Sequence, residues 1–234
     1  MKSELLKLIR KNRISSVEVA DALGKKGVIE GLAPLNPGNY IAGEIWYTAT
    51  WDNSNWPLHE QLQEMPSDVV VYVEGIRCEE RALFGDLVAK TVCLYGGARG
   101  LLVDGFVRDV HRLRKENYPI WCKGRSPLGC YNNNVLPTPE TQAYVSSRRK
   151  VLNGALVVAD DSGYTMIEPL RQNQELYDRL EFIELQEDIW YFCVDTLKLS
   201  TYETICKKVY LEKPDILPPA LREKLMAYNE KYKS

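Results

Sequence analysis

The sequence predicts an α/β domain followed by a mostly helical C-terminal extension. Apolar runs of strand type alternate with helical patterns over the first two thirds of the chain, and this alternation is typical of a sheet covered by helices. The last third is mostly helical in pattern. We therefore expect an α/β domain with N-terminal helices over residues 1–168 and a helical extension over residues 169–234, which serves as an oligomer or interface arm.

Each element of the N-terminal half rests on a local signal. A leucine-rich stripe predicts a helix over residues 3–11, and the capping-box spacing of Ser15 and Glu18 opens a second helix that Gly24 ends. Aromatic, β-branched and apolar runs, with turns around them, predict the elements that follow. These are strands over 40–50, 68–74 and 101–104, a helix after Pro57, and a helix over 79–95.

The C-terminal half is read in the same way. The prolines and asparagines of residues 123–150 indicate a loop-rich segment, and a DDSG turn separates two strands within residues 154–168. The capping box of Ser200 and Glu203 opens a helix. The remaining expected elements are a short helix over 109–116, a strand over 119–122 and helices over 170–195, 201–209 and 219–231.

Composition excludes several classes of protein. A net charge of −2 argues against nonspecific nucleic-acid binding, and no apolar run approaches the roughly 18 residues of a membrane-spanning helix. The N-terminus has charges within its apolar pattern, unlike a signal peptide. Six scattered cysteines without a CxxC pair indicate reduced thiols and a cytoplasmic protein, and two histidines without ligand spacing argue against zinc.

Opposite charges gather where the strand over residues 101–104 ends. Asp104 lies near this end, and Arg108 and Asp109 follow it directly. The carboxyl ends of strands are where α/β folds bind ligands. There an arginine suits a carboxylate, a carboxylate suits a hard divalent cation, and Asp86 provides a second carboxylate for proton transfer. The alternative is a plain salt bridge or helix cap, because such pairs are common and contribute little when exposed.

Four segments resemble one family. They are SSVEVADALG (15–24), FGDLVAK (84–90), GARGLLVDGFVRDVHRL (97–113) with YPIWCKGRSP (118–127), and GALVVADDSGYTMI (154–167). They are similar, in order and spacing, to the class II pyruvate aldolases that cleave 4-hydroxy-4-methyl-2-oxoglutarate. The same family contains the RraA regulators of ribonuclease activity. The resemblance implies a swivelling β/β/α sandwich, assembled as a trimer or hexamer.

The resemblance also implies roles for individual residues. Asp109 would ligate Mg²⁺ or Mn²⁺, and Arg108 would contact the pyruvyl group of a keto-acid substrate and steady its enolate. Asp86 would orient or deprotonate a water on the metal. The substrate carboxylate would bind beside Gly85, at the backbone N–H groups of Leu87 and Val88. The implied activity is a metal-dependent lyase that releases pyruvate by retro-aldol cleavage or decarboxylates oxaloacetate.

Three alternatives stay open at this point. One alternative function is a non-catalytic regulator that binds another protein, as in the RraA branch of the family. Another is a metal enzyme of the same scaffold that acts on another hydroxy or keto acid. The extension beyond residue 170 is not the usual family tail. Its Glu181, Glu184 and Glu187 are either acidic residues that complete a neighbour's site or the solvated face of a helix. The Trp-rich segment 46–60 is either a binding surface or packing at a strand end.

Overall fold

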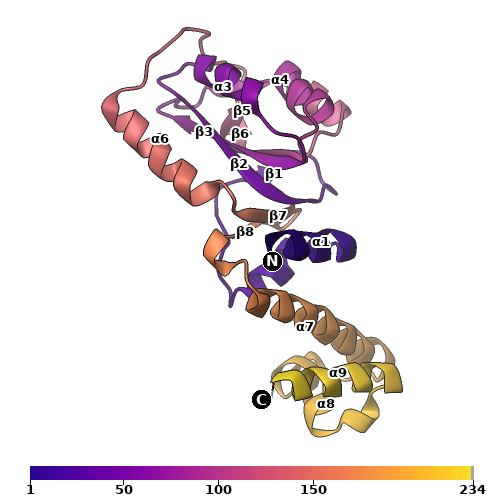
Figure 1. The fold of residues 1–234 in the computed structure, drawn as a ribbon. Helices are drawn as coiled ribbons and strands as arrows, with labels where there is room; N and C mark the ends of the chain where they lie inside the picture. Colours follow the sequence, from indigo (N-terminus) through magenta and orange to yellow (C-terminus); the bar gives the residue numbers. More distant parts are fainter. Residues whose placement is uncertain (233–234) are drawn as a thin grey trace. The chain divides into compact units, whose positions relative to one another are not determined.

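The computed structural model describes residues 1–232, with side chains described up to residue 230. The chain forms two compact units, Met1–Asn173 and Gln174–Ser234. Figure 1 shows the first unit as a sheet with helices and the second as a group of helices. No helix among the described residues is long and apolar enough to cross a bilayer.

One eight-stranded sheet is the frame of the first unit, in the order β1-β6-β5-β3-β2-β7-β8, with β4 paired to β5. The central strands β6, β5, β3 and β2 run parallel, while β1, β7 and β8 pair antiparallel. The strands are β1 (Ala33–Pro34), β2 (Ile41–Trp51), β3 (Val69–Ile76), β4 (Ala82–Phe84), β5 (Gly100–Val107), β6 (Ile120–Arg125), β7 (Leu156–Asp160) and β8 (Gly163–Ile167).

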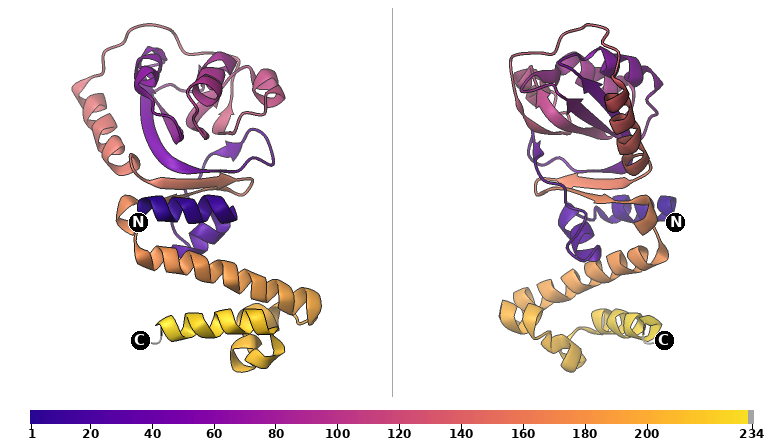
Figure 2. Two further views of the ribbon diagram at one scale, coloured as in Figure 1. Left: turned by 45° about the vertical axis from the view of Figure 1, so that its right-hand side comes forward. Right: turned by 90° about the vertical axis from the view of Figure 1, so that its left-hand side faces the viewer.

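Helices cover both faces of this sheet, which confirms the predicted α/β class (Figure 1). Apolar side chains of α3, α4 and α5 pack with Val71, Val73 and Val103 on one face, and α6 packs with Tyr47 and Tyr72 on the other. Figure 2 shows α1 and the β7–β8 hairpin at the same end of the unit. The helices are α1 (Lys2–Asn12), α2 (Ser16–Ala22), α3 (Trp56–Gln61), α4 (Asp86–Lys90), α5 (Val110–Lys115) and α6 (Pro139–Leu152).

The expected helix over residues 79–95 is wrong in its first part. Residues 82–84 form β4, which pairs with the end of β5 through Ala82–Phe106 and Phe84–Val107. All three residues of β4 are buried, so tertiary pairing outweighs their helical spacing. The helix begins only at Asp86, after an extended Gly85, and continues as a π-helical segment over Thr91–Tyr95.

The expected loop over residues 123–150 contains a helix that the prolines concealed. In α6, Pro139 occupies the first turn, where a missing N–H costs nothing. The Thr138 hydroxyl accepts a hydrogen bond from the Thr141 N–H and caps the helix. Strand β6 also extends three residues further than expected, to Arg125, because it pairs with the whole of β5.

The α6 helix is held to the sheet by a buried carboxylate. Glu74 of β3 is only 7% exposed. The Tyr47 and Tyr144 hydroxyls donate to it at 2.9 and 2.7 Å, and the Arg148 Nε donates at 3.0 Å. A buried charge is tolerated where it is paired and hydrogen-bonded in this way. This network fixes α6 across β2 and β3.

The second unit has a small core of its own. Leu185 and Ile189 of α7 pack with residues from the later helices, and the Phe182 and Tyr228 rings stack with centroids 4.4 Å apart. Ser200 and Glu203 form the expected capping box. The elements are α7 (Gln174–Tyr191), π-helical segments over Phe192–Thr196 and Tyr202–Cys206, α8 (Val209–Glu212) and α9 (Pro219–Tyr232).

Removing the charge partner of Glu74 should destabilise the first unit. In Arg148→Met the buried carboxylate keeps its tyrosine partners but loses its cation, and we expect a loss of about 2 kcal/mol in the free energy of unfolding because Arg148 is itself partly exposed. Urea unfolding measures this loss. Arg149→Met, which removes an exposed hydrogen bond to Gln61, is the matched control. Equal stability of the two variants would contradict a structural role for the network.

Candidate functional site

The candidate site begins where β5 ends. Arg108 follows the last residue of the strand, and its N–H donates to the Phe84 carbonyl at 3.0 Å. Asp109 then adopts a left-handed backbone conformation, with φ of 56°, and serves as the N-cap of α5. Non-glycine residues pay a conformational cost there, and such strain is concentrated at functional sites. The strand exit therefore presents Arg108 and Asp109 in a fixed turn that few residue types adopt readily.

Gly85 makes room for the Asp109 carboxylate. A Cβ atom added to Gly85 would lie 2.0 Å from the Asp109 Oδ2 atom, so no other residue type fits without displacing that carboxylate. Gly85 is the N-cap of α4, and its backbone is extended, with φ of −132°. The glycine is therefore required by the close approach of a side chain and not by its own backbone angles.

Arg108 is half exposed and reaches over the loop that follows β6. Its Nε lies 3.7 Å from the Asp109 Oδ2, which is a loose ion pair. A Cβ added to Gly129 would lie 2.6 Å from the Arg108 Nη1. The guanidinium therefore rests on the backbone of Gly129, and most of its hydrogen-bonding capacity is not used by Asp109.

Asp86 has an ion-pair partner that the sequence did not reveal. Arg112 Nη1 of α5 lies 3.1 Å from the Asp86 Oδ2. Burial opposes ionisation of Asp86, but the hydrogen bond and charge of Arg112, the Leu87 N–H and the Asp109 side chain together hold its pKa below the usual value. The position of Arg112, one turn after Asp109 on α5, was the available signal. An ionised carboxylate of lowered pKa accepts hydrogen bonds well and takes up a proton reluctantly.

The predicted anion site at the first turn of α4 stays a prediction. Leu87 and Val88 do occupy this turn, where N–H groups lack partners inside the helix. The Leu87 N–H, however, already interacts with the Asp86 carboxylate.

Arg108 and Asp109 border an open cleft of about 550 Å³. Arg108, Asp109 and His111 line one side, and Arg125 and Ser126 from the end of β6 line the other. Arg125 lies beside Val107 in the strand register. The cleft thus carries two guanidinium groups and one carboxylate, a charge balance that suits an acidic ligand.

The residues present fit a divalent cation that keeps most of its water. The Asp86 and Asp109 side chains interact directly, so two carboxyl groups share one small region. Mg²⁺ and Mn²⁺ accept one or two carboxylates, with water and substrate completing the shell. Within the part of the chain that the structure describes, no group of three or more His, Cys, Asp or Glu side chains could hold a metal ion. Asp86 and Asp109 are the two carboxylate donors at this place, and a hard ion held by two carboxylates keeps mostly water ligands.

Comparison with known proteins identifies the family at this point. The model for RraA-like proteins, described as Aldolase/RraA, matches residues 16–166. The chain belongs to the RraA-like family. This confirms the resemblance found in the sequence, and the mixed α/β fold agrees with it.

Two relatives of this chain carry different names. Protein DlpA of Legionella pneumophila is 28% identical over 195 residues, which are 80% of this chain and 31% of DlpA, so the chain spans about a third of that relative. A protein of Halalkalibacterium halodurans named "Putative 4-hydroxy-4-methyl-2-oxoglutarate aldolase" is 31% identical over 64% of this chain and 70% of its own length.

A solved structure of an RraA-like protein has the same fold. It is RraAS2 of Streptomyces coelicolor, described as an unusual member of the RNase ES inhibitor RraA protein family. The TM-score is 0.60 and the identity 25%, over 79% of this chain and 96% of that one.

Asp104, which the sequence placed beside the cluster, belongs to other contacts. It accepts a hydrogen bond from the Tyr72 hydroxyl at 3.1 Å and pairs with Lys123 of β6. Tyr72 belongs to the core on the α6 face, whereas α4 and α5 cover the opposite face. Lys123 is therefore engaged by a carboxylate within the sheet.

Two further motifs have structural roles. Asp160 caps α2 by accepting from the Ser16 N–H at 2.7 Å, and Asp161 accepts from the Gly38 N–H at 2.9 Å. In the Trp-rich segment, the Trp51 Nε1 donates to the Val135 carbonyl at 2.9 Å, and Ser54 bridges to Tyr131. These contacts support the packing interpretation of the segment.

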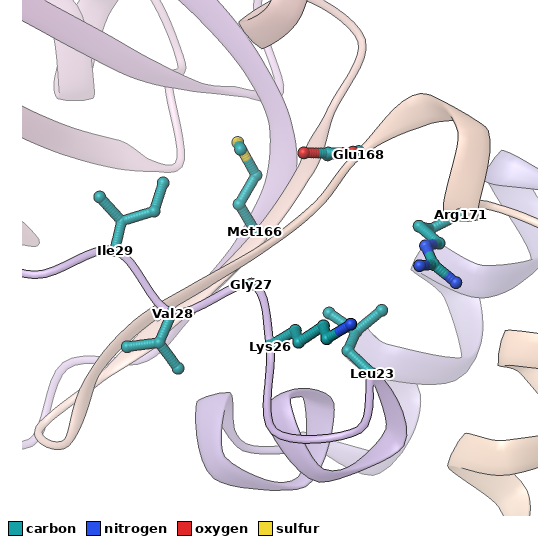
Figure 3. Close-up of a pocket in the computed structure, with 8 residues that line it drawn as sticks. All are labelled: Leu23, Lys26, Gly27, Val28, Ile29, Met166, Glu168 and Arg171. Carbon is teal, nitrogen blue, oxygen red and sulfur yellow. The ribbon is translucent and has the colours of Figure 1, made fainter.

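A second pocket lies at the other edge of the sheet and contains none of the predicted site residues (Figure 3). Its wall is apolar and its rim charged, and it has a volume of about 310 Å³. It borders β8, an antiparallel edge strand, and so lies away from the carboxyl ends of the parallel strands. Its lining residues are Leu23, Lys26, Gly27, Val28, Ile29, Met166, Glu168 and Arg171.

Loss of Arg112 should change the titration of Asp86. In Arg112→Met we expect the pKa of Asp86 to rise toward its usual value, so that the carboxyl protonates at a higher pH, because a cation and a hydrogen bond are removed. Carboxyl ¹³C NMR titration measures this shift. Arg114→Met on the same helix, whose Nε donates to the Leu35 carbonyl, is the control. An unchanged titration in Arg112→Met would show that the ion pair does not control Asp86.

Proposed function

We propose that this protein is a divalent-metal-dependent lyase that cleaves a 4-hydroxy-2-oxo acid to pyruvate. The observation that carries the proposal is the pair Arg108 and Asp109 in one cleft at the carboxyl end of β5, with the Asp86 side chain against Asp109. Membership of the RraA-like family, and the aldolase name of a relative 31% identical, support it.

Each residue has a chemical task in this proposal. Arg108 contacts the pyruvyl group and pairs with the negative charge that develops on the enolate. Asp86, which is ionised and held by Arg112, orients the water that takes the proton of the 4-hydroxyl group. The C3–C4 bond then breaks, the carbonyl fragment leaves, and protonation of the enolate at C3 gives pyruvate.

Asp109, with Asp86 nearby, would hold the Mg²⁺ or Mn²⁺. When bound, such an ion supplies Lewis-acid polarisation of the 2-keto oxygen. Oxaloacetate carries the same 2-oxo acid group, and loss of its distal carboxylate leaves the same enolate, so decarboxylation is expected from the same residues. The backbone around Gly85, Leu87 and Val88 is the proposed seat of the substrate carboxylate. We further propose a homo-oligomer, a trimer or hexamer, with unit 174–234 as an interface arm.

Pyruvate release tests the proposal directly. Oxaloacetate and 4-hydroxy-4-methyl-2-oxoglutarate, each with Mg²⁺ or Mn²⁺, should yield pyruvate in an NADH-coupled assay, and EDTA should abolish it. We expect Arg108→Ala to lower kcat/KM by about 10²- to 10³-fold, since a charged donor to the developing enolate is lost. Arg171→Ala, an exposed arginine outside the cleft, is the control. Turnover that survives in Arg108→Ala would rule out this assignment.

Gly85→Ala tests the metal assignment separately from turnover. The new Cβ should displace the Asp109 carboxylate, and we expect Mn²⁺ affinity to fall by about 10- to 100-fold, as when a ligand loses its support. Mn²⁺ titration followed by EPR measures this. Lys90→Ala, on the exposed side of the same helix, should bind Mn²⁺ as the wild type does. Unchanged affinity in a folded Gly85→Ala protein would exclude Asp109 as a ligand.

A second candidate function is a regulator that binds another protein. The likeness to RraAS2, whose description names an RNase ES inhibitor family, favours it. The second unit offers exposed aromatic rings, with Tyr191 66% and Tyr202 61% accessible, and exposed aromatic residues are common in protein interfaces. Folded protein that neither releases pyruvate nor binds Mn²⁺ would favour this function over the lyase.

A further inference from the structure

Two cysteines, Cys78 and Cys130, lie near the candidate site, since Cys130 follows Gly129, against which Arg108 rests. Cys78, on the connection between β3 and β4, is only 3% exposed, and Cys130, after β6, is half buried. Both pack in the core cluster on the α4 and α5 face. The Cys78 Sγ donates to the Ile76 carbonyl at 3.6 Å, and the Cys78 thiol also interacts with the Cys130 thiol and with the Asn53 backbone. The two thiols are therefore neighbours in this cluster.

Backbone pairing holds the two thiols in this position. The Cys130 N–H donates to the Ala82 carbonyl at 3.0 Å, and the Ala82 N–H donates to the Leu128 carbonyl at 2.7 Å. The Arg81 N–H, next to Ala82, donates to the Cys78 carbonyl at 3.0 Å. The start of β4 thus joins the two cysteine-bearing segments.

Two arginines make this pair electropositive. Arg81 Nη1 donates to the Gly129 carbonyl at 3.0 Å, and the Arg108 guanidinium rests on Gly129. The interaction with Cys78 lowers the pKa of Cys130 most, and the charges of Arg81 and Arg108 lower it further, against the effect of burial. The same interaction, together with burial, raises the pKa of Cys78. Cys130 is thus the more acidic of the two thiols.

We propose that Cys78 and Cys130 form a modification site at which a hydroperoxide oxidises the two thiols to a disulfide. Reactive thiols are low in pKa, partly accessible and close to a resolving thiol, and Cys130 has each of these properties. The other described cysteines with resolved shifts, Cys93, Cys122 and Cys193, have raised pKa values because they are buried.

The reaction balances in two steps. The Cys130 thiolate attacks one peroxide oxygen, so that an S–O bond forms, the O–O bond breaks, and the other oxygen leaves as water or an alcohol after taking a proton. The Cys78 sulfur then attacks the sulfenic sulfur of Cys130. The S–S bond forms, the S–O bond breaks, and hydroxide leaves with the Cys78 proton as water. The two thiols supply the two electrons that reduce the peroxide.

Oxidation of the two thiols changes the surroundings of the Arg108 guanidinium through Gly129. Disulfide formation draws Cys130 toward Cys78, and Gly129, the neighbour of Cys130, is the surface on which the guanidinium rests. We therefore expect oxidation to weaken anion binding in the cleft. This coupling, unlike the oxidation itself, rests on the proposed function of Arg108.

Peroxide treatment followed by alkylation and peptide mass spectrometry tests the oxidation. Wild-type protein should lose two of its six thiols in a Cys78–Cys130 linkage that dithiothreitol reverses. Cys130→Ser should lose thiols at least about tenfold more slowly, because the reactive thiolate is gone. Cys78→Ser should stop at a Cys130 sulfenic acid that dimedone traps. Cys93→Ser is the matched control and should behave as wild type.

The wild-type peptide map decides the matter even if a serine variant folds poorly. A linkage between other cysteines, unchanged thiols under peroxide, or a Cys130→Ser protein that loses thiols at the wild-type rate would overturn the proposal. Exposed Cys206 in the second unit is identified by its own peptide and does not enter the comparison.

Pyruvate affinity, measured on oxidised and reduced protein, tests the coupling. We expect several-fold weaker binding after oxidation and recovery with dithiothreitol. Equal affinity in the two forms would overturn the coupling and leave the disulfide intact. A reduced protein that binds no pyruvate would overturn the proposed function of Arg108, while the peptide map would still decide whether the thiol pair is a modification site.

Discussion

The pairing of β4 with the end of β5 is the constraint on which the candidate site depends. This short contact brings Gly85 against Asp109 and places the first turn of α4 beside the first turn of α5. The pairing therefore supports the ion pair between Asp86 of α4 and Arg112 of α5. The same strand also forms backbone hydrogen bonds with the segment around Cys130. The three residues of β4 therefore hold both the end of β5 and this segment in place. A small element with buried side chains thus determines the geometry of a much larger surface.

The sheet divides the charged residues of the first unit into two groups with different surroundings. On the α6 face, Glu74 and Asp104 are satisfied by tyrosines and by one cation each. Such fully partnered groups specify packing and have little capacity left for a ligand. At the strand ends, the Arg108 guanidinium and the Asp109 carboxylate form a loose ion pair, with Nε and Oδ2 3.7 Å apart. Unused hydrogen-bonding capacity, and not charge alone, distinguishes the candidate site.

Local signals in the sequence predicted much of this arrangement. Strand β5 and its charged exit, both capping boxes and the β7–β8 hairpin follow from apolar runs and turn residues. Strand β4 could not be predicted, because its three residues fit a helical pattern and only the partner strand selects the extended form. The roles of Asp104 and Arg112 were also hidden. Adjacent positions in a strand point to opposite faces, and the spacing of Arg112 after Asp109 does not by itself identify a partner on another helix.

The backbone of Asp109 has an evolutionary consequence. Asparagine is among the few non-glycine residues that adopt left-handed angles readily, as aspartate does, so it would keep the φ of 56° at this position. A single base change converts an aspartate codon into an asparagine codon. The step would remove the charge at the strand exit and leave the turn unchanged. A scaffold of this kind can therefore lose its chemistry and keep its shape, which offers a simple route by which one family comes to hold both catalysts and binding proteins.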